Sequence, residues 1–144
     1  MPGKPEKNDP TNRNKPTMNI PLLLVAVAAC GALGALTRYA VGVWLSGNGG
    51  SFPLATFVVN IVGCFLLGFL FFAPTSFGSL SPEIRTAITT GFLGALTTFS
   101  TFSVESFDLI GKGNVGMAIV NLAGSIAVGL LAVWLGQCAA SWIS

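Results

Sequence analysis

Four long apolar segments limit the folds open to this chain more than any other feature. They cover residues 20–45, 52–73, 83–110 and 115–137, and short stretches rich in Gly, Ser, Pro and Asn separate them. A helix that crosses a bilayer needs about 20 predominantly apolar residues, and each segment is long enough. The sequence therefore predicts an all-α, multi-pass integral membrane protein with four transmembrane helices and both termini on one side of the membrane.

The composition argues against most soluble functions. Only 8% of the 144 residues are charged, against about 25% in a typical soluble domain. The chain has no histidine, and its three cysteines lie inside the apolar segments without the paired spacing of a metal or disulfide site. No phosphate-binding loop motif occurs either. We therefore expect no enzyme activity.

Charge is concentrated in a polar N-terminal tail. Residues 1–17 hold four basic and two acidic side chains, whereas residues 18–144 hold three of each. The tail is rich in Pro and Asn and has almost nothing apolar to bury, so we expect it to be disordered. Residues 18–144 are expected to form the membrane domain. Their even charge leaves no basic patch, which argues against a nucleic-acid partner.

The third segment contains an unusual polar run near its centre. The sequence GFLGALTTFSTF, residues 91–102, combines glycine with closely spaced threonine and serine. Such residues weaken a helix and offer its backbone competing hydrogen bonds. A helix can break at membrane depth where protein or a polar cavity satisfies the freed backbone groups, and such breaks form ion sites. Spacing alone leaves two alternatives open: a helix broken at its centre, or a continuous helix whose hydroxyls bond to its own carbonyls.

Each segment carries polar residues, and where several occur their helical spacing places them on one face. Polar side chains are costly in hydrocarbon and are expected to face the bundle interior or a water-filled path. They could serve only to hold helices together, since a hydrogen bond between membrane helices contributes about 0.6 kcal/mol. Because every segment contributes, we favour a permeation path. The residues are Arg38 in the first segment; Thr56 and Asn60 in the second; Thr98, Thr101, Glu105 and Asp108 in the third; and Asn121 and Ser125 in the fourth.

The chemistry of these faces favours an anion. Amide and hydroxyl groups predominate, Arg38 is cationic, and Glu105 and Asp108 lie toward the end of the third segment rather than at its centre. Phe99 and Phe102 stand beside the polar face and could add the positive edges of their rings, although phenylalanine in a membrane helix is more often a lipid or core contact. A small proton- or cation-coupled exporter and a non-catalytic subunit of a membrane complex are the alternative functions.

Several motifs resemble those of the Fluc (CrcB) fluoride channel family. The most specific is GFLGALTTFSTF, and the others are GALGALTRYAVG (residues 31–42), FVVNIVGCFLLG (57–68), the wider RTAITTGFLGALTTFSTFSVE (85–105) and NLAGS (121–125). The resemblance implies a fluoride-selective channel that exports fluoride passively across the cytoplasmic (inner) membrane and so reduces fluoride toxicity. It also implies an antiparallel, dual-topology dimer with two pores and a structural sodium ion at its centre.

The same resemblance implies roles for individual residues. By position, Gly94 and Thr97 match the residues of the helix break whose backbone carbonyls hold the sodium ion. Phe99 and Phe102 match phenylalanines whose ring edges contact fluoride, and Asn60 matches an amide shared by two fluoride positions. Hydroxyls along the pore are matched by Thr56, Ser100, Thr101 and Ser125, and residues of the vestibule and pore end by Arg38 and Glu105.

Two features depart from the family pattern, Met117 and the N-terminal tail. Met117 stands where many relatives carry tyrosine, which affects the outermost pore contact. The basic residues of the tail join Arg85 on the amino-terminal side, against Lys112 on the other, and basic residues favour the cytoplasmic side. We therefore expect an inverted homodimer if the tail is absent or the insertion machinery ignores it, and otherwise a heterodimer with an inverted paralogue of opposite bias.

Overall fold

The computed structural model describes residues 20–45, 51–73 and 80–142. The prediction that residues 1–17 are disordered lies outside this part of the chain. All regular structure in the described residues is helical, and four segments are long and apolar enough to cross a membrane. The predicted fold class is therefore confirmed, and the chain is a multi-pass membrane protein.

The observed helices follow the predicted segments closely. Helix α1 covers Ile20–Leu45 and helix α2 covers Leu54–Phe72. The third span, Pro82–Gly111, is divided into α3 (Pro82–Thr86), the π-helix η4 (Ala87–Leu93), α4 (Gly94–Leu96) and α5 (Phe99–Gly111). Helix α6 covers Val115–Ser141 and so ends later than the predicted residue 137. Its apolar pattern continues past that point, because Cys138, Ala139 and Ala140 do not interrupt a helix.

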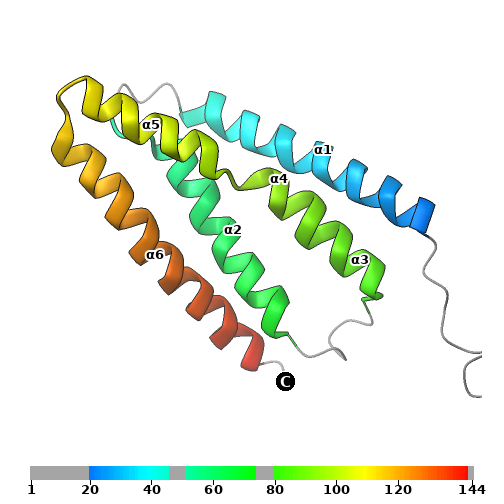
Figure 1. The fold of residues 1–144 in the computed structure, drawn as a ribbon. Coiled ribbons are helices and arrows are strands. Elements are labelled where there is room, and N and C mark those ends of the chain that lie inside the picture. The colour runs from blue at the N-terminus through cyan, green and yellow to red at the C-terminus, as the bar shows by residue number, and fades with distance from the viewer. Residues whose placement is uncertain (1–19, 46–50, 74–79, 143–144) are drawn as a thin grey trace, which may run out of the picture.

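The spans form two packed pairs. Helices α2 and α6 lie side by side, and α1 lies along the first half of the third span, while α5 continues that span beyond its break (Figure 1). A small apolar cluster of Val59, Leu93 and Leu96 joins α2 to η4 and α4. The start of α1 and the end of α6 lie at the same end of the bundle (Figure 1), as four spans require.

Glycine makes both helix pairs unusually close. A Cβ added at Gly34 would overlap the backbone carbonyl of Phe92, and one added at Gly136 would overlap the carbonyl of Phe65. Because the obstructing atoms belong to the backbone, a side chain could not rotate away from the clash. Small residues at these positions therefore let α1 reach η4 and α6 reach α2, as is typical of membrane helices.

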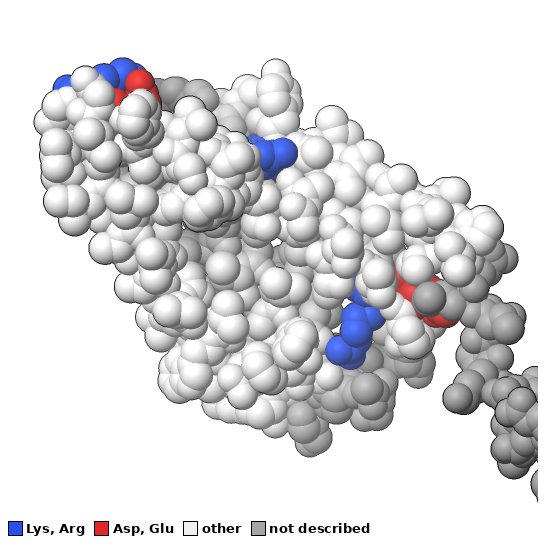
Figure 2. Space-filling view, in the orientation of Figure 1, with Lys and Arg blue, Asp and Glu red and all other residues white. Residues whose placement is uncertain are grey.

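The outer surface is apolar and almost uncharged. Large side chains such as Leu24, Leu36, Ile126 and Leu130 are each more than half exposed, which is stable only in contact with lipid or another apolar surface. Charged side chains occupy a few places on an otherwise uncharged face (Figure 2). Arg85 donates a 2.7 Å hydrogen bond from its guanidinium to the carbonyl oxygen of Leu70 and so satisfies a free carbonyl near the end of α2.

Candidate functional site

The third span breaks at Thr97 and Thr98. Helix α4 ends at Leu96, and both threonines are extended, with φ/ψ of −81°/150° at Thr97 and −149°/117° at Thr98. Helix α5 then begins at Phe99. The broken alternative predicted from GFLGALTTFSTF is therefore confirmed, and the continuous helix is wrong. The physical reason is that side chains of this span and of α2 satisfy the backbone at the break.

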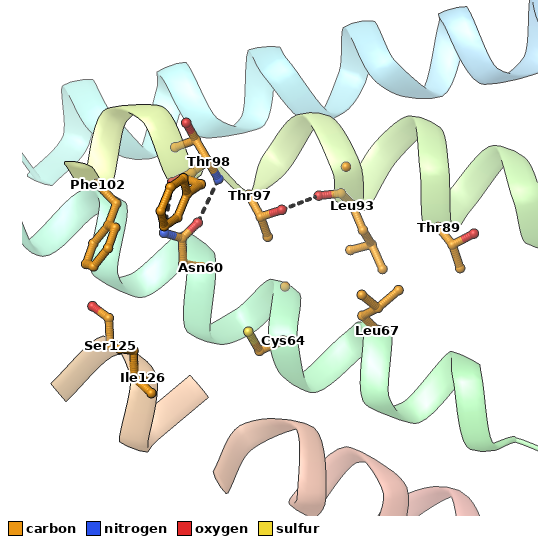
Figure 3. A pocket seen from close by; sticks show the side chains of 13 residues that line it. Asn60, Cys64, Leu67, Thr89, Leu93, Thr97, Thr98, Phe102, Ser125 and Ile126 are labelled. Atoms are coloured by element: carbon orange, nitrogen blue, oxygen red, sulfur yellow. Dashed lines mark hydrogen bonds between the residues drawn. The ribbon is translucent and has the colours of Figure 1, made fainter. Parts of the chain in front are cut away.

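The Asn60 side chain on α2 holds both backbone polar groups of Thr98. The Thr98 N–H donates to Asn60 Oδ1 at 2.8 Å (Figure 3), and Asn60 Nδ2 donates to the Thr98 carbonyl at 3.2 Å. On the preceding turn, the Thr97 hydroxyl donates to the Leu93 carbonyl at 3.0 Å. Thr98 also caps α5, since its hydroxyl oxygen accepts the Thr101 N–H at 3.3 Å. Both backbone polar groups of Thr98 and the N–H of Thr101 are thus bonded within the chain.

These bonds free the carbonyls of Gly94 and Thr97. In a continuous α-helix the N–H groups of Thr98 and Thr101 would donate to these two carbonyls, four residues earlier. Here the Thr98 N–H bonds to Asn60 and the Thr101 N–H bonds to the Thr98 hydroxyl. Carbonyl oxygens at the negative end of a helix suit a hard cation. The carbonyl oxygens of Gly94 and Thr97 therefore suit the sodium ion that the resemblance implies.

A π-helical segment precedes the break, and the sequence did not predict it. Residues Ala87–Leu93 form η4, and π-helical turns are rare and common at functional sites. The hydroxyl of Thr89 bonds to the carbonyl of Arg85 at 2.9 Å, so a side chain competes for a backbone acceptor at the start of the segment. The adjacent pair Thr89 and Thr90 beside Gly91 is the sequence signal that could have suggested irregular helix here.

The first groove lies beside the break and has a volume of about 360 Å³. We call it the phenylalanine groove; among its lining residues are Asn60, Gly94, Thr97, Phe99, Phe102 and Ser125. Figure 3 shows the side chains of Asn60 on α2, Phe102 on α5 and Ser125 on α6, all of which line this groove. The surface of the groove is largely apolar, with amide and hydroxyl groups at few points. The structure thus brings together most of the predicted pore residues and both predicted sodium ligands.

The two phenylalanines of this groove differ sharply in exposure. The Phe102 side chain is buried, at 9% exposed, whereas Phe99 is 80% exposed. Their ring centroids are 5.8 Å apart and the ring planes are inclined by 41°. Phe99 therefore stands at the outer margin of the groove, and a single chain encloses only one of the two rings.

The second groove, of about 370 Å³, holds the remaining residues that the resemblance implied for the pore and vestibule, except Ser100. We call it the arginine groove; Arg38, Thr56, Thr101 and Glu105 lie along it. The Thr56 hydroxyl donates to Glu105 Oε1 at 2.8 Å, and Glu105 Oε2 is buried and accepts no hydrogen bond from the described residues. Within that part of the chain, Arg38 makes no ion pair with Glu105. The predicted pore and vestibule residues thus divide between two grooves.

Three predicted positions, Ser100, Asp108 and Asn121, lie outside both grooves, and Asn121 belongs to the buried cluster described below. Ser100 is exposed at the start of α5, with its hydroxyl oxygen 3.4 Å from that of Thr98. Asp108, expected on the polar face of the third segment, instead forms an exposed 2.6 Å ion pair with Lys112 near the end of α5. The polar face therefore does not extend to Asp108 as residue spacing predicted. Asp108 lies in the last turn of α5, only three residues before the helix ends.

A buried polar cluster between α5 and α6 was only partly anticipated. Asn121 is 1% exposed and donates from Nδ2 to the Ser106 hydroxyl oxygen at 3.0 Å. Ser106 donates in turn to the Phe102 carbonyl at 2.7 Å, and Ser125 donates to Asn121 Oδ1 at 3.4 Å. The spacing of Asn121 and Ser125 gave a signal for the α6 side. Ser106 was missed, although it lies four residues after Phe102.

Known proteins resemble this chain over most of its length. Residues 25–137 match the model of the family described as CrcB-like protein, Camphor Resistance (CrcB). The fluoride-specific ion channel FluC of Acidobacterium capsulatum is 49% identical over 112 residues, which are 77% of this chain and 90% of that protein. The proteins of the same name from Stutzerimonas stutzeri and Geotalea daltonii are 44% and 43% identical and cover 77% and 83% of this chain; their own lengths are covered to 90% and 98%.

The matched region contains the second and third spans, both grooves and most of the first and fourth spans, which extend to Ile20 and Ser141 beyond it. The broken third span and the residues around it lie well inside the match. This chain belongs to the CrcB-like family.

Proposed function

We propose that this chain forms a fluoride-selective channel that passes fluoride down its gradient across the cytoplasmic membrane and so lowers cytoplasmic fluoride. The curated relatives are named as fluoride-specific ion channels, and this chain matches them over 90–98% of their own length. The single structural observation that carries the proposal is the phenylalanine groove, a space of about 360 Å³ whose lining includes the amide of Asn60, the hydroxyl of Ser125 and the rings of Phe99 and Phe102.

The groove offers partners that can replace the water around a small anion. Asn60 Nδ2 has two hydrogens, and its bond to the Thr98 carbonyl uses one of them. Ser125 adds a hydroxyl, and the ring edges of Phe99 and Phe102 carry the positive part of the aromatic quadrupole. No acidic side chain lies among the residues of this groove. An ion that holds water tightly needs several such donors at once, and no full negative charge opposite it.

We further propose that two copies pair in opposite orientations. Phe99 is 80% exposed, so one chain leaves a proposed pore contact outside its own fold. A Cβ added at Gly94 would lie 3.8 Å from the nearest neighbouring atom, the Thr89 carbonyl oxygen, so packing within the chain does not require glycine there. A second copy placed against this face would cover the exposed ring and enclose two pores, and the approach of its backbone would require the glycine.

A sodium ion between the two breaks is the cofactor we propose. The Gly94 and Thr97 carbonyls of each chain, freed as described above, would hold it, and the ion would supply a central positive charge that ties the subunits together. We expect the thermal stability of the purified protein to rise with sodium concentration, since a bound ligand stabilises the folded state. Melting temperatures in sodium chloride and in N-methylglucamine chloride of equal ionic strength measure this. Equal melting temperatures would refute the sodium site but not the proposed channel function.

Fluoride efflux from liposomes tests the channel itself. Purified protein in vesicles loaded with potassium fluoride should release fluoride to an electrode when valinomycin supplies a counter-ion path, without any proton gradient. A proton- or cation-coupled exporter would instead require its coupling gradient and would saturate with substrate. A subunit that serves only assembly would release no fluoride. Efflux no faster than from fluoride-loaded liposomes without protein would refute the proposed function.

A further inference from the structure

The buried cluster between α5 and α6 lies beside the proposed pore but outside it. Asn121 and Ser106 line neither the phenylalanine groove nor the arginine groove. They are 1% and 4% exposed, and Asn121 is the largest side chain of the described residues that is fully buried. A buried amide at membrane depth is costly unless it is bonded, so the cluster needs a reason beyond packing.

The hydrogen bonds of the cluster run in one direction, from Ser125 through Asn121 and Ser106 to Phe102. The two inner bonds are short, at 3.0 Å from Asn121 Nδ2 to Ser106 Oγ and 2.7 Å from Ser106 Oγ to the Phe102 carbonyl. The outer bond, from the Ser125 hydroxyl to Asn121 Oδ1, is 3.4 Å and therefore weak. Asn121 is thus firmly tied to α5 and only loosely tied to Ser125.

The ends of this chain of bonds are both groove residues. Phe102 contributes a ring to the phenylalanine groove from α5, and Ser125 contributes a hydroxyl from α6. Helices α5 and α6 are also joined by the turn at Gly113, whose positive φ of 78° suits glycine. That turn lies at the ends of the helices, whereas the bond from Asn121 to Ser106 joins α5 to α6 one helical turn from Phe102 and from Ser125.

We propose that Asn121 and Ser106 are positioning residues of the pore: Asn121 holds α5 through Ser106 and so fixes the Phe102 ring relative to Ser125. Neither residue contacts the ion. The weak outer bond lets Ser125 turn its single hydroxyl proton to a passing anion while Asn121 stays bound to Ser106. This inference rests on the proposed fluoride conduction and adds to it the residues that hold the two sides of the groove in register.

The test uses single-channel fluoride currents in planar bilayers, because only assembled channels produce them. Ser106→Thr keeps the hydroxyl, and Ser106→Val has the same shape without it, so their ratio isolates the hydrogen bond. We expect Ser106→Val to carry about tenfold less current than Ser106→Thr, the effect typical of losing an outer-shell partner. Fluoride over chloride selectivity should fall with it. A merely structural role would lower the number of channels and leave the current of each unchanged.

A double-mutant cycle separates positioning from direct ion contact. If Asn121 acts through Ser106, the double variant Asn121→Leu/Ser106→Val should carry no less current than Asn121→Leu alone. If the two reductions multiply, Asn121 contacts the ion independently and the proposal is wrong. Equal currents for Ser106→Thr and Ser106→Val would also overturn it. If the wild-type protein carries fluoride current in the same bilayers, either of these results refutes the positioning role and leaves the proposed channel function intact.

Ser103 provides the matched control. Its hydroxyl donates to the Phe99 carbonyl at 2.8 Å, which is the same local bond that Ser106 makes to Phe102, and no bond from Ser103 to α6 occurs in the described structure. Ser103→Val and Ser103→Thr should carry currents within about twofold of each other, as surface substitutions usually do. A tenfold difference there would mean that the local bond, rather than the link to α6, matters.

Discussion

At the scale of single residues, Asn60 decides how the third span breaks. Its carboxamide takes the Thr98 N–H that would otherwise continue the helix, and this leaves the Gly94 carbonyl without its helical partner. The resemblance to the fluoride channels implied that Asn60 contacts fluoride, and that role stays a prediction. The structure adds a role in the backbone that residue spacing could not reveal, because the partner lies on another helix and 38 positions along the chain.

Replacing Asn60 by leucine tests this role. The Thr98 N–H would be left buried without a partner, which costs about 1–3 kcal/mol, so the free energy of unfolding in detergent should fall by that amount. Urea denaturation followed by tryptophan fluorescence measures it. Thr37→Val is the control, because the exposed Thr37 hydroxyl bonds only within α1, to the Leu33 carbonyl. An Asn60→Leu protein as stable as the control would contradict the backbone role.

The ring of Phe102 gives a second prediction at this scale. Phe102→Ile keeps an apolar side chain in the groove and removes the positive ring edge. We expect fluoride efflux per channel to fall about tenfold, which corresponds to about 1.4 kcal/mol of lost interaction. Liposome efflux measures the rate, and the protein should still be monodisperse in detergent because the volume changes little. Unchanged flux would exclude a ring-edge contact.

At the scale of elements, the apolar length of each segment was enough to predict the helices, and turn residues predicted their ends. The π-helix η4 was not predicted, because Thr89, Thr90 and Gly91 indicate only a weakened helix, whereas the type of helix that forms where η4 packs against α1 does not follow from those residues alone. The break itself was predicted only as one of two alternatives. Threonine, serine and glycine weaken a helix locally, but whether it breaks depends on acceptors supplied by a neighbour.

The contact between α1 and η4 gives a prediction at this scale. Gly34→Ala adds a Cβ that overlaps the Phe92 backbone carbonyl, so we expect a loss of about 1–3 kcal/mol in stability from overpacking. Gly42→Ala, in the same helix, meets no atom within 4 Å and should stabilise the protein by about 0.5–1 kcal/mol through helix propensity. Thermal unfolding of both variants measures the difference. If Gly34→Ala were as stable as Gly42→Ala, the predicted clash between α1 and the Phe92 carbonyl would be wrong.

At the scale of the whole molecule, the sequence could not predict that the candidate site residues divide between two grooves. Periodicity placed Thr101 and Glu105 on one helical face with Thr98, but did not show that the break turns Thr98 toward the phenylalanine groove and leaves Thr101 in the arginine groove. The dimer, the pairing of each groove with a partner and the sodium ion remain proposals at this level.

Orientation of the chain gives the prediction that belongs to this scale. A cysteine placed at Asn8, in a protein whose native cysteines are replaced by serine, can be labelled with a membrane-impermeant maleimide from outside in intact cells and from the cytoplasmic side in inverted membrane vesicles. Labelling from both sides is expected if the chain inserts in both orientations and forms an inverted homodimer. Labelling from one side only would mean that the basic tail fixes the orientation and that an oppositely oriented paralogue completes the dimer.

The bond between Asn60 and Thr98 also has a consequence for the order of biogenesis. Helix α2 leaves the ribosome before the third span does, and chains generally begin to organise from the N-terminal side during synthesis. The carboxamide of Asn60 is therefore already within the bilayer when Thr98 arrives. The interruption can form as the third span enters, so no complete helix has to be pulled apart afterwards in a solvent that offers the backbone no replacement partner.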